Sequence, residues 1–132
     1  MTLVVDSSAI IALLLDEPEA SSIEFALAES FPVVISAATL VEVSLVAESR
    51  LGPQGALAVD QILRHADIDV VALSEEAARE AIDGWRRYGK GRHPAALNMG
   101  DCYTYGLVRS LDAVLLCVGN DFAQTDIELL PL

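Results

Sequence analysis

Four acidic residues, far apart in the chain, occupy positions where their carboxylates could meet. Asp6 and Asp121 each follow an apolar stretch that we interpret as a strand. Asp101 stands at the predicted start of a helix, and Glu42 lies in a helix that begins just after another strand. Ligands of open parallel sheets gather at the carboxyl ends of the strands, so we expect the four side chains to converge at that edge.

Converging carboxylates repel one another unless a cation lies between them. At about 4 Å and an effective dielectric constant near 20, each like-charged pair costs roughly 4 kcal/mol. Mg²⁺ or Mn²⁺ prefers carboxylate oxygens and retains several waters, which leaves coordination positions for a substrate phosphate. Such an ion can activate water and stabilise a leaving oxygen. The acidic set therefore points to hydrolysis of a phosphodiester.

Each of these carboxylates also has a purely structural interpretation. Asp6 is a favoured residue type for capping the helix that follows it, and Asp101 can cap a helix or complement its dipole. Glu42 can be a solvated helix residue, although its neighbours are mostly apolar. Asp121 lies in a Gly-Asn-Asp sequence, which is typical of turns. The residues alone leave both interpretations open.

The elements that would position these side chains alternate between strands and helices. Apolar, β-branched runs predict strands over residues 3–5, 33–35, 70–73 and 113–118, with a short closing segment at 127–130. Helical spacing, Ser caps and Gly or Pro breaks predict a first helix through residues 10–14 and helices over about residues 19–29, 37–51 and 75–88. They also predict a helix through residues 57–63 and one that starts near residue 100 and runs through 108. Alternation of this kind requires crossover connections and predicts an α/β fold, a three-layer α/β/α sandwich with a mainly parallel central sheet.

Composition limits the class of protein. The chain is 53% hydrophobic and 5% aromatic, so its core must consist mainly of Ala, Val, Ile and Leu. No internal repeat or linker divides residues 1–132, which we expect to form a single domain. The longest apolar run, residues 9–15, is far shorter than the roughly 20 residues of a membrane-spanning helix. Cys102 and Cys117 lack metal-ligand spacing and are expected to be buried thiols of a cytoplasmic protein.

The net charge of −12 opposes binding to nucleic acid and favours bound cations or a basic protein partner. The few cations are unevenly distributed, however, because four of the eight Lys and Arg residues fall in one short segment. We call this segment the basic cluster, and it consists of Arg86, Arg87, Lys90 and Arg92, with His93 adjoining. It is either a solvated face or a place where phosphates bind.

Four parts of the sequence, taken in order, carry a resemblance to a known family. They are VVDSSAIIA from residue 4, ATLVE from residue 38, GKGRH from residue 89 with LNMGDC from residue 97, and GNDF from residue 119 with TDI from residue 125. Together they resemble PIN domains, and specifically the VapC-type toxins of toxin–antitoxin pairs. The resemblance covers nearly the whole chain and implies a PIN-like fold.

The resemblance also implies an activity and its partners. It implies a ribonuclease that depends on Mg²⁺ or Mn²⁺, is held inactive by a cognate VapB-like antitoxin, and usually forms a homodimer. The basic cluster would hold the phosphates of RNA on either side of the cut bond. Among RNA substrates tRNA is weakly preferred, because the target is set by loop shape and surface charge rather than by the carboxylates.

By position, the resemblance assigns roles to individual residues. Asp6 and Asp101 would be the principal metal ligands. Glu42 and Asp121 would complete the catalytic set by coordinating through water, by binding a second metal or by positioning the attacking water. The supporting residues would be Ser7, through its hydroxyl, and Asn98, which would orient Asp101 or contact a phosphate. Asp126 is an additional acidic residue whose role the resemblance does not define.

Two functions from other classes compete with this interpretation. A phosphoacceptor signalling domain would have adjacent acidic residues after its first strand and a lysine after a late strand. Here Asp6 is followed by two serines, and the sole lysine, Lys90, follows a helix. A noncatalytic adaptor could use the acidic edge only to bind a basic protein. It would keep that partner after its carboxylates were neutralised and would show no metal-dependent cleavage.

Overall fold

The computed structural model describes residues 1–132 and contains one parallel sheet of four strands in the order β3-β2-β1-β4. The strands are short, as expected of a sheet buried on both faces. They are β1 (Leu3–Val5), β2 (Val33–Ser36), β3 (Ile68–Val71) and β4 (Val114–Leu116). Because β1 pairs in parallel with both β2 and β4, the carboxyl ends of these three strands lie at one edge.

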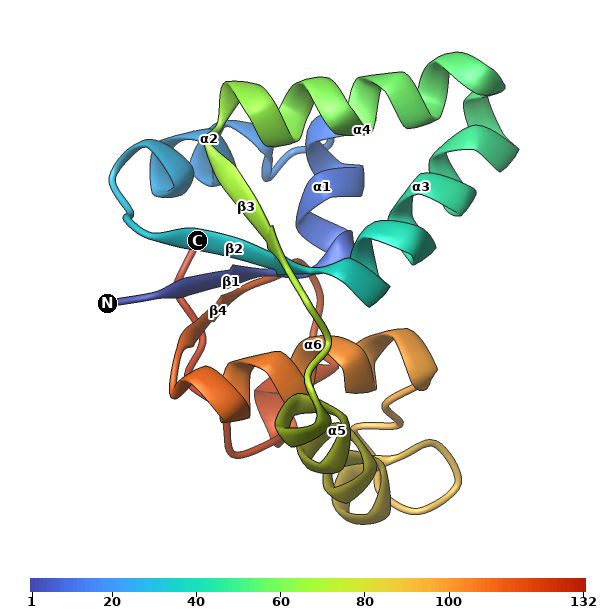
Figure 1. The fold of residues 1–132 in the computed structure, drawn as a ribbon, viewed down its shortest axis with the longest axis vertical. Helices are drawn as coiled ribbons and strands as arrows, with labels where there is room; N and C mark the ends of the chain where they lie inside the picture. Colours follow the sequence, from blue (N-terminus) through green and yellow to red (C-terminus); the bar gives the residue numbers. More distant parts are fainter.

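Helices cover both faces of the sheet and make the expected three layers (Figure 1). One layer holds α1 (Ser7–Leu14), α2 (Ala20–Ala28), α3 (Ala37–Leu51) and α4 (Pro53–His65), and the other holds α5 (Glu75–Tyr88) and α6 (Met99–Leu111). Successive strand residues point to opposite faces. Accordingly Val5 packs in the core of the first layer, and Val4 packs in the core of the second. The predicted fold class is confirmed.

The bounds of three strands differ from the prediction, and β2 differs only by the addition of Ser36. β3 begins two residues earlier than expected, because Val33 and Val34 of β2 pair with Ile68 and Asp69. As an edge strand, β3 leaves Asp69 exposed, so a charged residue is tolerated there. β4 covers three residues instead of six, and the closing segment adds only an isolated bridge between Leu115 and Leu129.

The predicted caps explain where several helices begin. The Ser36 hydroxyl accepts a hydrogen bond from the Ala38 amide at 3.2 Å and caps α3. Ser74 caps α5 by accepting from the Ala77 amide at 3.1 Å. The full capping box expected at Ser74 does not form, since the third helical residue is Ala77 and has no side-chain acceptor. None of the helices combines the length and the hydrophobicity that crossing a bilayer would require.

Candidate functional site

Asp6 lies at the carboxyl end of β1, where it is 4% exposed and fully hydrogen-bonded. Its Oδ2 accepts from the Ser8 amide at 3.1 Å and from the Ser8 hydroxyl at 2.7 Å, which caps α1. Its Oδ1 accepts from the Thr104 hydroxyl at 2.8 Å. The capping interpretation of Asp6 is therefore correct, and the same bonds fix its carboxylate in one orientation at the sheet edge.

Two buried threonines connect this carboxylate to the helices on either side of the sheet. The hydroxyl oxygens of Thr39 on α3 and Thr104 on α6 lie 3.4 Å apart, and both residues are 0% exposed. The sequence analysis missed both threonines. A signal was present, since Thr39 precedes Glu42 by three residues and Thr104 follows Asp101 by three, which places each on the same helix face as its acid.

Asp101 stands in the first turn of α6 and forms a reciprocal capping box with Asn98. The Asp101 amide donates to Asn98 Oδ1 at 2.9 Å, and the Asn98 amide donates to Asp101 Oδ2 at 3.1 Å. Asn98, rather than Asp101, is the residue that caps the helix. The dipole at the helix start favours the negative charge of Asp101.

Glu42 faces the start of α6 from α3. Gly100 lies so close to the Glu42 carboxylate that a side chain at position 100 would overlap its oxygens. Burial raises the pKa of Glu42, a hydrogen bond from Ser7 lowers it, and repulsion by Asp6 raises it further. The absence of a side chain at Gly100 therefore lets the two helices bring Glu42 and Asp101 together.

The electrostatics of Asp101 show that the four acids form one cluster. Burial raises its pKa to about 6, against the effect of the hydrogen bond from the Asn98 amide, and repulsion by Asp6, Asp121 and Glu42 contributes to the rise. Asp121 reaches this cluster from an exposed turn five residues beyond β4, and not directly from the strand end as expected.

Both cysteines are buried, as predicted, and lie against this negative charge. Burial raises the pKa of Cys117 to about 12, with added repulsion from Asp6, Asp121 and Asp101. Burial together with the charge of Asp101 raises the pKa of Cys102 to about 11. A thiol that stays protonated is a poor nucleophile and a poor metal ligand, so neither cysteine contributes chemistry to the site.

The four carboxylates are chemically suited to a divalent cation. Hard cations such as Mg²⁺ bind carboxylate oxygens. Burial is the main cause of the raised pKa of Asp101, and repulsion by Asp6, Asp121 and Glu42 adds to it, so a cation bound here would offset both effects. As the side chains are placed, no three Asp, Glu, His or Cys residues already form a metal-binding arrangement. To share an ion with the held carboxylates of Asp6 and Asp101, Glu42 and Asp121 would have to move closer to them.

Some residues of the basic cluster bind other protein groups, and others have no carboxylate partner. Arg87 pairs with Asp126 at 3.2 Å and with Asp83 at 3.8 Å. The guanidinium of Arg87, a predicted RNA contact, is held by these carboxylates in the structure, and its role in RNA binding stays a prediction. His93 is also engaged, since its Nδ1 accepts from the Ala95 amide at 3.0 Å. The three cations without a carboxylate partner are Arg86, Lys90 and Arg92.

Asp126 belongs to a network separate from the four carboxylates. Its carboxylate accepts from the Tyr105 hydroxyl at 2.8 Å and pairs with Arg87 and Arg109 at 3.2 and 3.3 Å. These contacts join the C-terminal segment to α5 and α6. Asp126 is therefore a structural residue and not a member of the acidic cluster.

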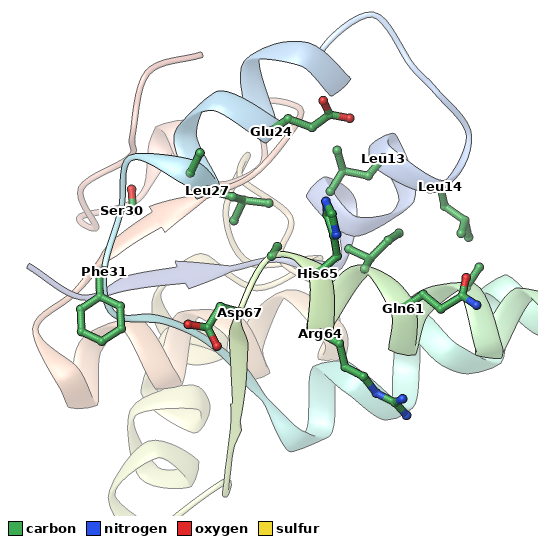
Figure 2. A pocket seen from close by; sticks show the side chains of 14 residues that line it. Leu13, Leu14, Glu24, Leu27, Ser30, Phe31, Gln61, Arg64, His65 and Asp67 are labelled. Atoms are coloured by element: carbon green, nitrogen blue, oxygen red, sulfur yellow. The ribbon is translucent and has the colours of Figure 1, made fainter.

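A large groove lies elsewhere, between α1, α2 and α4 (Figure 2). Its volume is about 1250 Å³, and its lining includes Leu13, Leu27 and Ile62 together with Glu24 and His65. None of the four carboxylates lines it. The acidic residues singled out in the sequence therefore lie outside this groove.

The sequence matches one family model and several bacterial proteins along nearly its whole length. The family description "PIN domain" matches residues 3–128. Ribonuclease VapC30 of Mycobacterium tuberculosis is 42% identical over 130 residues, which are 98% of this chain and 99% of that protein. Ribonuclease VapC of Mycolicibacterium smegmatis is 41% identical over 125 residues, or 95% of this chain and 97% of that protein.

Solved structures share the fold at low sequence identity. VapBC2 from Rickettsia felis, determined bound to a DNA fragment from its promoter, superposes with a TM-score of 0.77 at 12% identity and covers 98% of this chain and 97% of its own. At this identity the likeness concerns the fold alone.

Proposed function

Because the chain belongs to the PIN-domain family and, within it, to the VapC ribonucleases, we propose that residues 1–132 form one nuclease domain that hydrolyses RNA phosphodiester bonds. The observation that carries the mechanism is the gathering of four carboxylates at the sheet edge, where burial raises the pKa of Asp101 most and repulsion by Asp6, Asp121 and Glu42 adds to the rise. A nuclease whose substrate is a polyanion needs a cation at such a place.

In this proposal Asp6 and Asp101 are the principal ligands of Mg²⁺ or Mn²⁺, and Glu42 and Asp121 complete the set. When bound, the ion supplies Lewis acidity to the phosphate and lowers the pKa of water. The protein supplies fixed orientations: Ser8 and Thr104 hold Asp6 through hydrogen bonds.

The other residues of the site have positioning and proton-accepting roles. Asn98 holds Asp101 through the capping box. A carboxylate with a raised pKa accepts a proton more readily, so Glu42 is suited to orient and deprotonate the attacking water. Ser7 supports Glu42 through its hydroxyl.

The substrate and the inhibitor would use opposite charges of the same surface. Arg86 and Lys90 are free to pair with RNA phosphates, which would offset part of the repulsion from the net charge of −12. A cognate VapB-like antitoxin would block the same edge with a basic segment, and an arginine forming two hydrogen bonds with the carboxylates would be an effective plug. We propose that this takes place in the cytoplasm.

A homodimer is also proposed. Large apolar side chains on α3 and α4 are exposed, among them Val41 at 59%, Leu45 at 66% and Leu57 at 62%. Exposed apolar surface of this kind is typical of contacts between subunits.

The test of the function is cleavage of mixed cellular RNA by protein purified free of antitoxin, with Mn²⁺ or with EDTA. We expect the wild type and Asp126→Asn to cut RNA only with Mn²⁺, and Asp101→Asn to be inactive under both conditions. Equal behaviour of the wild type and Asp101→Asn would refute the proposal. Binding of a basic partner without cleavage, retained in Asp101→Asn, would favour the noncatalytic adaptor.

A further inference from the structure

The only tryptophan of the chain is exposed beside the basic cluster. Trp85 lies in the last turn of α5 and is 43% exposed, an unusual position for the largest apolar side chain. The guanidinium of Arg92 lies over its ring, 4.2 Å from the centroid. The ring of Trp85 therefore carries the guanidinium of Arg92, which pairs with no carboxylate.

The indole is held in a fixed place by the loop that follows α5. The Gly89 backbone packs against the Trp85 ring, and a side chain at position 89 would overlap atoms Cδ1 and Nε1. The Gly89 amide also donates to the Trp85 carbonyl at 2.8 Å. Gly89 has an ordinary φ of −69°, so contact with Trp85, and not backbone strain, is what requires a glycine.

The same loop connects Trp85 firmly to the acidic cluster. Gly89 and Leu97 form a parallel bridge, in which the Lys90 amide donates to the Leu97 carbonyl and the Leu97 amide to the Tyr88 carbonyl, both at 3.0 Å. Leu97 directly precedes Asn98, whose capping box holds Asp101. Figure 1 shows this loop running between the end of α5 and the start of α6.

The charges around Trp85 fit a nucleic acid strand. Arg86, Lys90 and Arg92 have no carboxylate partner. The paired arginines are Arg79, Arg87 and Arg109, and the two other unpaired ones, Arg50 and Arg64, belong to α3 and α4. In a chain of net charge −12, free cations beside an exposed aromatic ring are the features of a surface that stacks bases and pairs with phosphates.

We propose that Trp85 is a stacking site for one unpaired nucleobase of the RNA, next to the bond that is cut. The base takes the position of Arg92 on the indole, and the released guanidinium pairs with a phosphate. The exchange is favourable because a base stacks on an aromatic ring more strongly than an exposed cation does. This inference rests on the proposed function and adds that the substrate is single-stranded at this point, since paired bases are not available for stacking.

The single tryptophan allows a direct binding test. In an Asp101→Asn background, Trp85 fluorescence would be titrated with an unstructured RNA of 12 nucleotides in Mg²⁺, and with the same RNA annealed to its complement. We expect saturable quenching by the single strand and little by the duplex. Arg86→Gln should weaken binding but leave the quenching at saturation unchanged. No quenching by single strands that bind, or equal quenching by the duplex, would overturn the proposal.

Steady-state cleavage separates stacking from a structural role. We expect Trp85→Leu to raise KM about tenfold with little change in kcat, and Trp85→Phe to restore most of the loss. Phe25→Leu, which removes an exposed aromatic from α2, is the matched control and should behave like the wild type. An unchanged KM in Trp85→Leu overturns the stacking site while leaving the nuclease intact. Absence of cleavage by the wild type refutes the proposed function instead, and the fluorescence titration still tests stacking.

Discussion

At the scale of single residues, the acids of the site have two roles at once. Asp6 and Asp101 each accept backbone hydrogen bonds at the start of a helix and each add negative charge to the cluster. These roles are compatible because the amides at a helix start stabilise an anion in a defined orientation. The cost is repulsion among neighbours, which a divalent cation would relieve.

The repulsion predicts that neutralising Asp101 stabilises the metal-free protein. The pKa of Asp101 in the folded protein, about 6, exceeds its ordinary value near 4, so binding of a proton to Asp101 stabilises the fold. This stabilisation is complete below pH 4 and is lost as the pH rises through 6. Asp101→Asn avoids this loss, and its side-chain oxygen can still accept from the Asn98 amide. In EDTA we expect its Tm to exceed that of the wild type by about 4 °C at pH 7.5, with a smaller gap at pH 4.5. A lower Tm at pH 7.5 would mean that capping outweighs repulsion.

Gly100 provides a prediction that separates activity from stability. Gly100→Ala would place a methyl group against the Glu42 carboxylate, which can rotate away because it ends a flexible side chain. Alanine also favours the helix by about 1 kcal/mol. We expect RNA cleavage to fall at least about tenfold, the equivalent of about 1.4 kcal/mol of transition-state stabilisation, while the free energy of unfolding stays equal or rises. Unchanged cleavage would show that the position of Glu42 is not needed.

At the scale of elements, local patterns predicted what depends on local interactions. The caps at Asp6 and Ser36 and the end of α5 at Tyr88 follow from residue types and spacing, and all are present. The limits of β3 depend on pairing with β2, which neighbouring residues in the sequence do not encode. The spacing of Thr104 from Asp101 indicates the helix face on which Thr104 lies, but its hydrogen bond to Asp6, 98 residues away, depends on the tertiary fold.

The hydrogen bond and ion pairs of Asp126 predict that its replacement by Asn lowers the stability of the protein, whereas replacement of Asp101 raises it. Burial acts to raise the pKa of Asp126, but the hydrogen bond from Tyr105 and the charges of Arg87 and Arg109 lower it overall. Its stability contribution is therefore present above pH 4 and is lost as the pH falls through the folded-state pKa. Asp126→Asn should destabilise the protein by about 1 kcal/mol at neutral pH, measured by urea unfolding, and less in acid.

This substitution should leave metal-dependent cleavage intact, because Asp126 joins α5, α6 and the C-terminal segment and does not face the acidic cluster. Loss of cleavage at unchanged stability would instead place Asp126 in the site.

At the scale of the whole molecule, the charge distribution reconciles an acidic protein with an RNA substrate. Twenty acidic residues give the net charge of −12, yet three cations without a carboxylate partner, Arg86, Lys90 and Arg92, lie at the end of α5 and in the loop that leads to Asp101. A cation held by the four carboxylates would reduce repulsion where the substrate must approach. Metal binding and RNA binding should therefore be linked.

We propose that the four distant carboxylates share one divalent ion. Their affinity for Mn²⁺ can be measured by an equilibrium titration followed by electron paramagnetic resonance. We expect the wild type and Asp126→Asn to bind Mn²⁺ with the same affinity. Asp6→Asn and Asp101→Asn should each bind at least about tenfold more weakly, the equivalent of about 1.4 kcal/mol. Equal affinity for Mn²⁺ in all four proteins would show that the carboxylates do not form a shared metal site.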